Sequence, residues 1–467
     1  MIDFNLPFSI QQLVTQEQAF HYRIIPVALQ QGVTVLKTDH SELQQLQMEL
    51  TILWNTPIEI VADTTENINR YLSTNYRQTQ SDSISEIHYT TDFLEKIVIN
   101  AKEIGSSDIH FEPYETNARV RFRLDGKLKE QFTIAIDEYP ILINKIKIRA
   151  QLDISEKRLP QDGRITMPTN GEDFDIRVSI LPTLHGEKVV LRILSKDTSH
   201  IDINALGFTP KELTLYQENI RKPNGIILIS GPTGSGKTTT LYATLKKLNL
   251  PNTNILTVED PIEYTLEGIN QVQLRENIGL DFAATLRTFL RQDPDIIMVG
   301  EIRDVNTANM AIRAALTGHL VLSTIHTNSA WATVSRLIDM GIPPFLIAST
   351  LNISVAQRLI RKLCDYCKTE DVIQNNLFPI GFKVPTTLTS HHKAVGCDRC
   401  HHTGYSGRKA IYELLPIDAV LSEKIKNNQL SIDNYLEENK INTLKSNAIQ
   451  LIQEGTTSVE EVFSLLL

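Results

Sequence analysis

The sequence lacks any long hydrophobic run. Its longest apolar stretches, such as residues 225–229 and 296–300, fall far short of the roughly 20 residues that an apolar helix needs to cross a bilayer. Residues 1–14 contain no basic stretch followed by a long apolar core, so they do not resemble a secretory signal. We therefore expect a cytoplasmic protein without a membrane span.

An excess of positive charge is also missing. The chain has 46 Lys and Arg residues against 55 Asp and Glu residues, which gives a formal net charge of −9. Nucleic-acid binding depends on neutralisation of phosphates by Lys and Arg, and no strip of interleaved aromatic and basic residues is found. The composition therefore disfavours direct nucleic-acid binding. With 41% hydrophobic residues and no tandem repeat, a folded protein is expected.

Cysteine is scarce, and its spacing is informative. The only four cysteines form two CxxC pairs, Cys364 with Cys367 and Cys397 with Cys400. In a reducing compartment such pairs favour metal thiolates over disulfides, and two pairs supply the four ligands of a tetrahedral Zn²⁺ site. A site with four thiolates leaves no position for water, so we expect a structural role. The nearby histidines rank second as ligands: His391, His392, His401 and His402.

The length and the changes in pattern divide the chain into several units. At roughly 150 residues per domain, 467 residues are too many for one hydrophobic core. A polar, serine-rich stretch at 78–85 has too little apolar surface to pack and indicates a linker. The expected units are a small N-terminal α/β domain at 1–77, a linker at 78–89, an α+β domain at 90–197, a parallel-sheet core at 206–361, a cysteine-bearing subdomain at 362–409 and a helical region at 410–467.

Residues 231–238, Gly-Pro-Thr-Gly-Ser-Gly-Lys-Thr, fit the phosphate-loop pattern GxxxxGK[ST]. An apolar strand precedes them and a helix at 239–248 follows, which is the context that the motif requires. The glycines let backbone N–H groups surround an anionic phosphate, and the helix N-terminus adds partial positive charge. Lys237 is expected to reach the β and γ phosphates, and Thr238 to ligate Mg²⁺. The predicted nucleotide contacts are Gly231, Pro232, Thr233, Gly234, Ser235, Gly236, Lys237, Thr238 and Thr239.

Near-continuous apolar strands at 226–229, 255–258, 296–299 and 320–325 predict a buried parallel sheet. Three of these strands end in groups suited to nucleotide hydrolysis, namely Glu259 and Glu263, then Glu301, then His326. Ligands bind beyond the carboxyl ends of strands in open parallel sheets, so these side chains are expected to share one crevice with the phosphate loop. An acidic residue after a strand is usually part of a solvated loop or a helix cap, so each acidic cluster alone is weak evidence. Spacing does not separate Glu259 from Glu263.

Together these segments resemble the secretion ATPase superfamily: the phosphate loop at 231–238, an aspartate box at 257–263, a Walker B segment at 296–304 and a histidine box at 317–326. The resemblance continues at 107–113, 152–164 and 186–192, so it covers the chain from about residue 90 onward. The sequence is similar to assembly ATPases of type II secretion systems and type IV pili. Its cysteine module resembles the zinc-containing extension and secretion branch, whereas retraction ATPases generally lack that element.

The resemblance implies an α/β, multi-domain fold with a RecA-like ATPase core, a preceding PAS-like α+β domain and a zinc subdomain. It implies a homohexamer that binds ATP between the two main domains, with Arg177 and Arg192 reaching the phosphates. Glu301 would serve the Mg²⁺ shell, and a glutamate of the aspartate box would activate water. The implied partners are platform and docking proteins of the inner membrane, to which the protein would attach peripherally from the cytoplasm.

Other interpretations stay open at this point. A nucleotide-gated scaffold with little turnover and a nucleic-acid translocase use the same kind of core. Asn306 and Ser329 stand where similar sequences commonly carry Glu and Asp, which affects packing or contacts between domains. The sequence does not separate secretion from pilus extension or DNA uptake.

Overall fold

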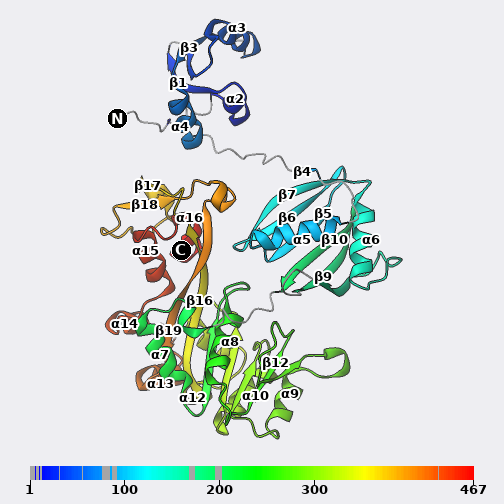
Figure 1. The fold of residues 1–467 in the computed structure, drawn as a ribbon. Coiled ribbons are helices and arrows are strands. Elements are labelled where there is room, and N and C mark those ends of the chain that lie inside the picture. The colour runs from blue at the N-terminus through cyan, green and yellow to red at the C-terminus, as the bar shows by residue number, and fades with distance from the viewer. Residues whose placement is uncertain are drawn as a thin grey trace.

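The computed structural model describes residues 6, 10, 13–30, 32–54, 56–75, 85–86, 92–167, 174–194, 202–429 and 431–467 (Figure 1). Four β-sheets organise these residues. Of the expected linker at 78–89, only Ser85 and Glu86 are described, as the short strand β4. Within the described segments, every helix is too short or too polar to traverse a lipid bilayer.

The N-terminal unit is a three-stranded sheet with helices. Strands β1 (Ile24–Gln30) and β2 (Val33–Thr38) are antiparallel, and β3 (Ile58–Ala62) lies parallel to β2. The helices are α2 (Gln16–His21), α3 (Leu43–Trp54) and α4 (Thr65–Asn75). Alternate residues of β2 are buried, as expected for a sheet with one face covered. The α/β character predicted for this segment is thus present.

The second unit is a seven-stranded sheet in the order β4-β7-β6-β5-β10-β9-β8. Its longer strands are β5 (Asp108–Pro113), β6 (Asn117–Leu124), β7 (Lys127–Ala135), β8 (Gln161–Met167), β9 (Phe174–Thr183) and β10 (Gly186–Leu194). Helices α5 (Phe93–Glu103) and α6 (Tyr139–Arg149) share one core with the inward side chains of the sheet. The alternation in β6 sends Val120 and Phe122 into this core and three arginines to the other face. That polar face can therefore contact the other units of the chain.

The third unit holds the predicted parallel sheet, in the order β13-β12-β14-β15-β11-β16-β19. Its strands are β11 (Gly225–Ser230), β12 (Ile255–Glu259), β13 (Asn270–Gln273), β14 (Ile296–Val299), β15 (Leu320–Ile325), β16 (Leu351–Leu363) and β19 (Tyr405–Pro416). All neighbours are parallel except β16 and β19. The four apolar runs predicted as parallel strands are therefore strands β11, β12, β14 and β15.

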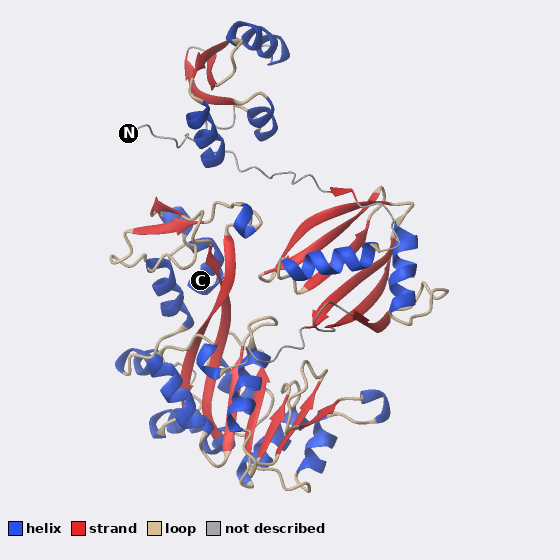
Figure 2. Ribbon diagram, in the orientation of Figure 1, coloured by secondary structure: helices blue, strands red, loops and turns tan. Residues whose placement is uncertain are grey.

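Helices cover both faces of this sheet, as Figure 2 shows. They are α7 (Pro210–Ile220), α8 (Lys237–Leu248), α9 (Phe282–Phe289), α10 (Val305–Leu316), α11 (Ala332–Asp339), α12 (Pro344–Thr350) and α13 (Ala419–Lys426). Helix α8 begins at Lys237, two residues before the start predicted from the sequence. Gly236, whose φ is 86°, is its N-cap. The helix can begin there because glycine tolerates this left-handed conformation.

Strands β16 and β19 run across the expected boundaries at 361/362 and 409/410 toward the cysteine module (Figures 1 and 2). That module includes the antiparallel pair β17 (Thr369–Val372) and β18 (Ser390–Lys393). The remaining helices are α14 (Asp433–Glu438), α15 (Leu444–Gln453) and α16 (Val459–Leu466). Helix α15 begins after Thr443, whose side chain caps it by accepting from the N–H of Ser446.

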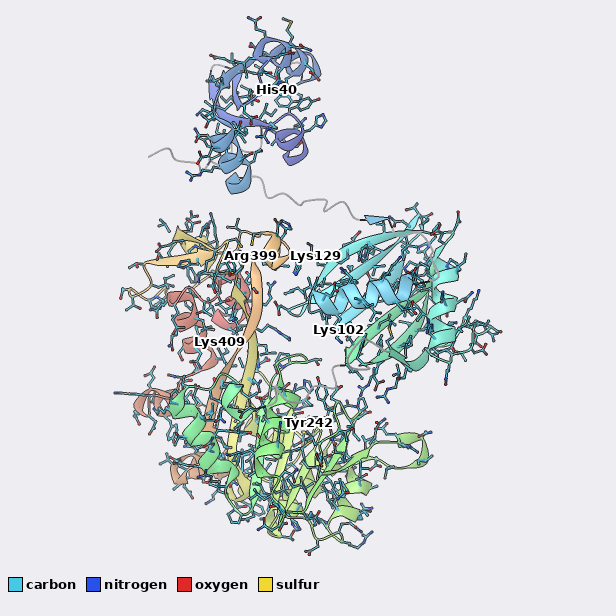
Figure 3. All side chains as sticks on the ribbon, in the orientation of Figure 1. His40, Lys102, Lys129, Tyr242, Arg399 and Lys409 are labelled. Atoms are coloured by element: carbon cyan, nitrogen blue, oxygen red, sulfur yellow. The ribbon has the colours of Figure 1, made fainter. Side chains whose placement is uncertain are left out.

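The α+β unit contacts the cysteine module. Lys129 Nζ donates to the carbonyl of His401 at 2.9 Å, and the Gly407 N–H donates to Asp125 Oδ2 at 2.9 Å. Figure 3 places Lys129 beside Arg399 of that module. The hairpin turn between β6 and β7, which contains Asp125 and Gly126, thus lies at a junction between units.

Candidate active site

The phosphate loop lies between β11 and α8, and it packs tightly against β16. A Cβ built on Gly231 would lie 2.5 Å from the Gln357 carbonyl oxygen, and one on Gly236 would lie 2.8 Å from Gln357 Nε2. A side chain at position 231 would force the loop away from the strand because it would meet backbone, whereas one at position 236 would displace the end of the Gln357 side chain. The Ser235 hydroxyl is buried and has no hydrogen-bond partner among the described residues. The loop geometry therefore fits the predicted phosphate cradle.

Lys237 turns back over this loop. Its Nζ donates to the carbonyl oxygens of Gly231 at 2.8 Å and Pro232 at 3.1 Å, and the residue is only 9% exposed. Burial lowers the pKa of Lys237, while the negative charge of Glu301 raises it and the positive charge of Arg358 lowers it further.

Glu301 and His326 lie together at the ends of neighbouring strands. Glu301 follows β14 by two residues, and His326 comes directly after β15. His326 Nε2 is 3.4 Å from Glu301 Oε2, and Arg303 forms an ion pair with Glu301 Oε1. Glu301 and His326 thus lie together, and the charge of Glu301 acts on Lys237 of the phosphate loop.

The two glutamates of the aspartate box have different surroundings. Glu259 is 3% exposed and accepts hydrogen bonds from Tyr242, from Thr257 at 2.7 Å and from Gln271 at 3.0 Å. Tyr242 belongs to α8 and is labelled in Figure 3 on the unit that holds the parallel sheet. Glu263 lies beyond the strand, and its side chain is 32% exposed. Both Glu259 oxygens are engaged in the protein interior, whereas Glu263 can face a ligand.

Arg177 connects the two main units. Its Nη1 donates to Glu263 Oε2 at 3.2 Å, and its Nη2 donates to the Ile262 carbonyl at 2.5 Å. Arg177 lies on β9 of the α+β unit, so this contact brings the sheet face opposite its helices to the aspartate box. Arg177 and Arg192 also line a cavity of about 290 Å³.

Arg192 makes its hydrogen bond within its own sheet. Its Nε donates to Asp108 Oδ1 at 2.9 Å, and its side chain is 56% exposed. The Asp108 hydrogen bond raises the pKa of Arg192 against the opposing effect of burial, and the charges of Asp108 and Glu263 add to that rise. The charge of Glu263 therefore acts on Arg192, whereas the hydrogen bond of Arg192 is to Asp108.

Two further arginines, Arg121 and Arg123, bind carboxylates of β5. Arg121 Nη2 donates to Glu112 Oε1 at 2.8 Å, and Arg123 Nε is 3.3 Å from Asp108 Oδ2. Burial raises the pKa of Glu112, but hydrogen bonds from Arg121, Lys188 and Arg119 outweigh it and bring the pKa to about 2. These cations hold the sheet face together.

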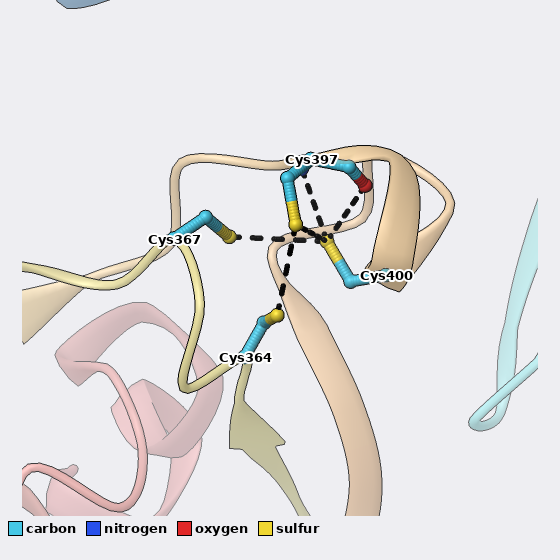
Figure 4. Close-up of side chains that lie close together, drawn as sticks. All are labelled: Cys364, Cys367, Cys397 and Cys400. Atoms are coloured by element: carbon cyan, nitrogen blue, oxygen red, sulfur yellow. Dashed lines mark hydrogen bonds between the residues drawn. The ribbon is translucent and has the colours of Figure 1, made fainter.

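The four cysteines converge. Their sulfur atoms all lie within 4.8 Å of one another, with Cys364 and Cys397 at 3.8 Å and Cys367 and Cys400 also at 3.8 Å (Figure 4). Among the described residues, this is the one group with metal-ligand geometry, and it contains no histidine. The donor set therefore fits a tetrahedral thiolate site.

The two residues that depart from similar sequences have local roles. The backbone N–H of Asn306 donates to Asp304 Oδ1 at 2.8 Å, within the cap of α10. Ser329 Oγ accepts from the Ala332 N–H at 3.1 Å, a role that aspartate also performs. Asn306 and Ser329 thus both form local hydrogen bonds at these positions.

Sequence reasoning missed Tyr242 and Gln271, which bond to Glu259, and also the pair Gln357 and Arg358 beside the phosphate loop. Gln357 Oε1 accepts from Thr240 of α8 at 2.9 Å. A partial signal for this pair exists, because both residues are polar and lie next to each other in the middle of strand β16. No local pattern marks the other two, since their role depends on packing between distant segments.

The chain is similar in sequence to known proteins. The family described as "Type II/IV secretion system protein" matches residues 85–464. The type IV pilus assembly ATPase PilB of Myxococcus xanthus is 41% identical, over 98% of this chain and 87% of that protein. The type II secretion system ATPase E of Vibrio cholerae is 46% identical, over 77% of this chain and 71% of that protein.

Solved structures resemble the fold. The pilus retraction motor PilT with bound ADP matches with a TM-score of 0.53 and 26% identity, over 79% of this chain and 95% of that chain. The ATPase DotB of Legionella pneumophila matches with a TM-score of 0.61 and 21% identity, over 82% of this chain and 99% of that chain. The chain therefore belongs to the type II/IV secretion system protein family, and its similar members are the ATPases of type II secretion and type IV pilus assembly.

Proposed function

We propose that the protein is a Mg²⁺-dependent, homohexameric ATPase motor that couples ATP hydrolysis to assembly of a type II secretion pseudopilus or a type IV pilus. The contact between Arg177 of the α+β unit and Glu263 of the core carries this proposal. A nucleotide bound beside Glu263 would contact both units at once. Its hydrolysis would therefore change the contacts between the two units. Hydrolysis could thereby drive rotation between domains.

The proposed roles follow from position. Backbone N–H groups within residues 231–239, where only Pro232 lacks one, cradle the phosphates, and Lys237 neutralises the β and γ phosphates. Thr238 and Glu301 would hold Mg²⁺, which supplies charge neutralisation when bound. Arg177 and Arg192 neutralise charge from the α+β unit, and His326 hydrogen-bonds the γ phosphate.

Glu263 is the better supported group for activating water. A general base needs an oxygen that can reach a water molecule, and the Glu263 side chain is partly exposed. The oxygens of Glu259 already accept hydrogen bonds from Tyr242, Thr257 and Gln271. We therefore assign Glu259 to holding the aspartate box in place.

The proposed partners are inner-membrane platform and docking proteins, with the N-terminal unit as the docking domain. The similar proteins are named for secretion and pilus assembly, which supports a site of action on the cytoplasmic side of that membrane. The net charge of −9 weighs against a nucleic-acid track.

The proposal is tested by measuring mass and ATP turnover together over a series of protein concentrations with Mg²⁺. We expect a hexameric mass and a turnover per subunit that rises as hexamers form. Full turnover by a monomer would contradict the ring mechanism. Stimulation by DNA that weakens steeply with salt would favour a translocase instead.

We also propose that Cys364, Cys367, Cys397 and Cys400 hold a structural Zn²⁺, which would staple the module at the far end of β16 and β19. Purified protein should contain about one zinc per chain, and Cys397→Ser should lose the metal and lower the melting temperature. His402→Asn is the matched control, because His402 lies beside the cluster and pairs with Asp398 at 3.0 Å. Loss of zinc in this control, or full retention in Cys397→Ser, would contradict the four-thiolate site.

A further inference from the structure

The guanidinium of Arg358 lies beside the phosphate loop. Arg358, on β16, donates from Nη1 to the Gln357 carbonyl at 3.0 Å and from Nη2 to the Asn328 carbonyl at 3.0 Å. Its Nη1 is 3.1 Å from a Cβ built on Gly231, the first residue of the loop. Among the described residues, no carboxylate lies within ion-pair distance of it.

This arrangement is costly for a cation. Burial lowers the pKa of Arg358, and the charge of Glu413 only partly opposes this effect. Arg361, three residues further along the same strand, is instead ion-paired to Glu461 at 2.6 Å. A partly desolvated guanidinium that has only carbonyl acceptors can still gain strongly from an anion.

The strand order fixes which end of a nucleotide Arg358 faces. Glu301 follows β14 and the aspartate box follows β12, and both strands lie on the β15 side of the phosphate-loop strand β11. Strand β16 lies on the opposite side of β11. Hydrolysis requires the γ phosphate to lie toward the carboxylates, so the rest of the nucleotide extends toward β16.

We propose that Arg358 binds the α and β phosphates that ATP and ADP share, at the end of the phosphate loop away from the catalytic carboxylates. This inference rests on the proposed ATPase function and adds a binding residue to it. Arg358 also bonds to Asn328, two residues after His326. One guanidinium therefore contacts both the nucleotide and the segment that follows the histidine.

The inference is tested by titrating fluorescent ATP and ADP analogues against the parent protein, Arg358→Gln and Arg358→Lys. Removal of a charge-assisted hydrogen bond predicts that Arg358→Gln raises the Kd for both nucleotides by about tenfold, with KM rising more than kcat falls. Arg358→Lys, which keeps the charge and loses the forked geometry, should show a smaller rise. Lys362→Gln removes a charge from an exposed position on the same strand and should bind both nucleotides like the parent.

Circular dichroism of each variant confirms that it is folded, and Arg358→Lys supplies the comparison if Arg358→Gln is not. Parent-like binding of both nucleotides by the folded Arg358 variants would overturn the inference. A loss confined to ATP would also overturn it, because the contact would then be to the γ phosphate. If the parent protein itself bound neither nucleotide, the proposed function would fail, and this inference with it.

Discussion

Replacement of Lys237 with alanine is expected to abolish ATP turnover. Lys237 is 9% exposed and its ammonium group bonds to the carbonyls of Gly231 and Pro232, so this group is held over the loop where phosphate charge must be neutralised. Loss of one preorganised donor to a developing charge lowers kcat by about 10²–10³-fold, and Lys237 also carries a full charge. Steady-state phosphate release with saturating Mg²⁺ and ATP measures this effect.

Lys247→Ala is the matched control. Lys247 lies on the same helix, is exposed and carries the same charge, so its removal should leave turnover unchanged. The result also separates a motor from a nucleotide-gated scaffold. If the parent protein releases no more phosphate than Lys237→Ala, the chain binds nucleotide without acting as a motor.

Glu263→Gln is expected to lower kcat by about 10²–10⁴-fold, the usual contribution of a general base. The amide keeps the size of the side chain and cannot accept the proton of water. Nucleotide binding and the melting temperature should change little, because Glu263 is partly exposed and its described side-chain contact is with Arg177. Single-turnover hydrolysis and nucleotide titration distinguish the chemical step from binding.

Glu259→Gln provides the contrast, because it changes stability. Its oxygens accept from Tyr242, Thr257 and Gln271 in a buried site, and an amide presents a donor where acceptors are needed. A mismatched buried group costs about 1–3 kcal/mol, so a lower free energy of unfolding is expected. Equal stability with abolished turnover in Glu259→Gln, together with an active Glu263→Gln, would reverse the assignment.

The sheet and the phosphate loop could be predicted because their signals are local. Near-continuous apolar runs indicated the four parallel strands, and the glycines of the loop stand between a strand and a helix. The start of α8 was two residues off because Gly236 caps the helix, a detail of backbone conformation that the periodicity of side chains does not record.

The rest of the site depends on contacts between distant segments. Arg177 and Glu263 are 86 residues apart, and the pairing of Thr240 with Gln357 spans 117 residues. Spacing alone left Glu259 and Glu263 equivalent, and only burial and the partners Tyr242 and Gln271 distinguish them. Arg358 was missed because its proposed role in nucleotide binding follows from the order of the strands in the sheet. No single segment of the sequence encodes that order.

The most direct test of the account is a structure of the protein with Mg²⁺ and a non-hydrolysable ATP analogue. We expect one triphosphate held by Lys237, with Glu301, Glu263 and His326 around its γ phosphate and Arg177 reaching it from the α+β unit. A triphosphate bound elsewhere, or one that leaves Glu301 and His326 remote from its γ phosphate, would contradict the account.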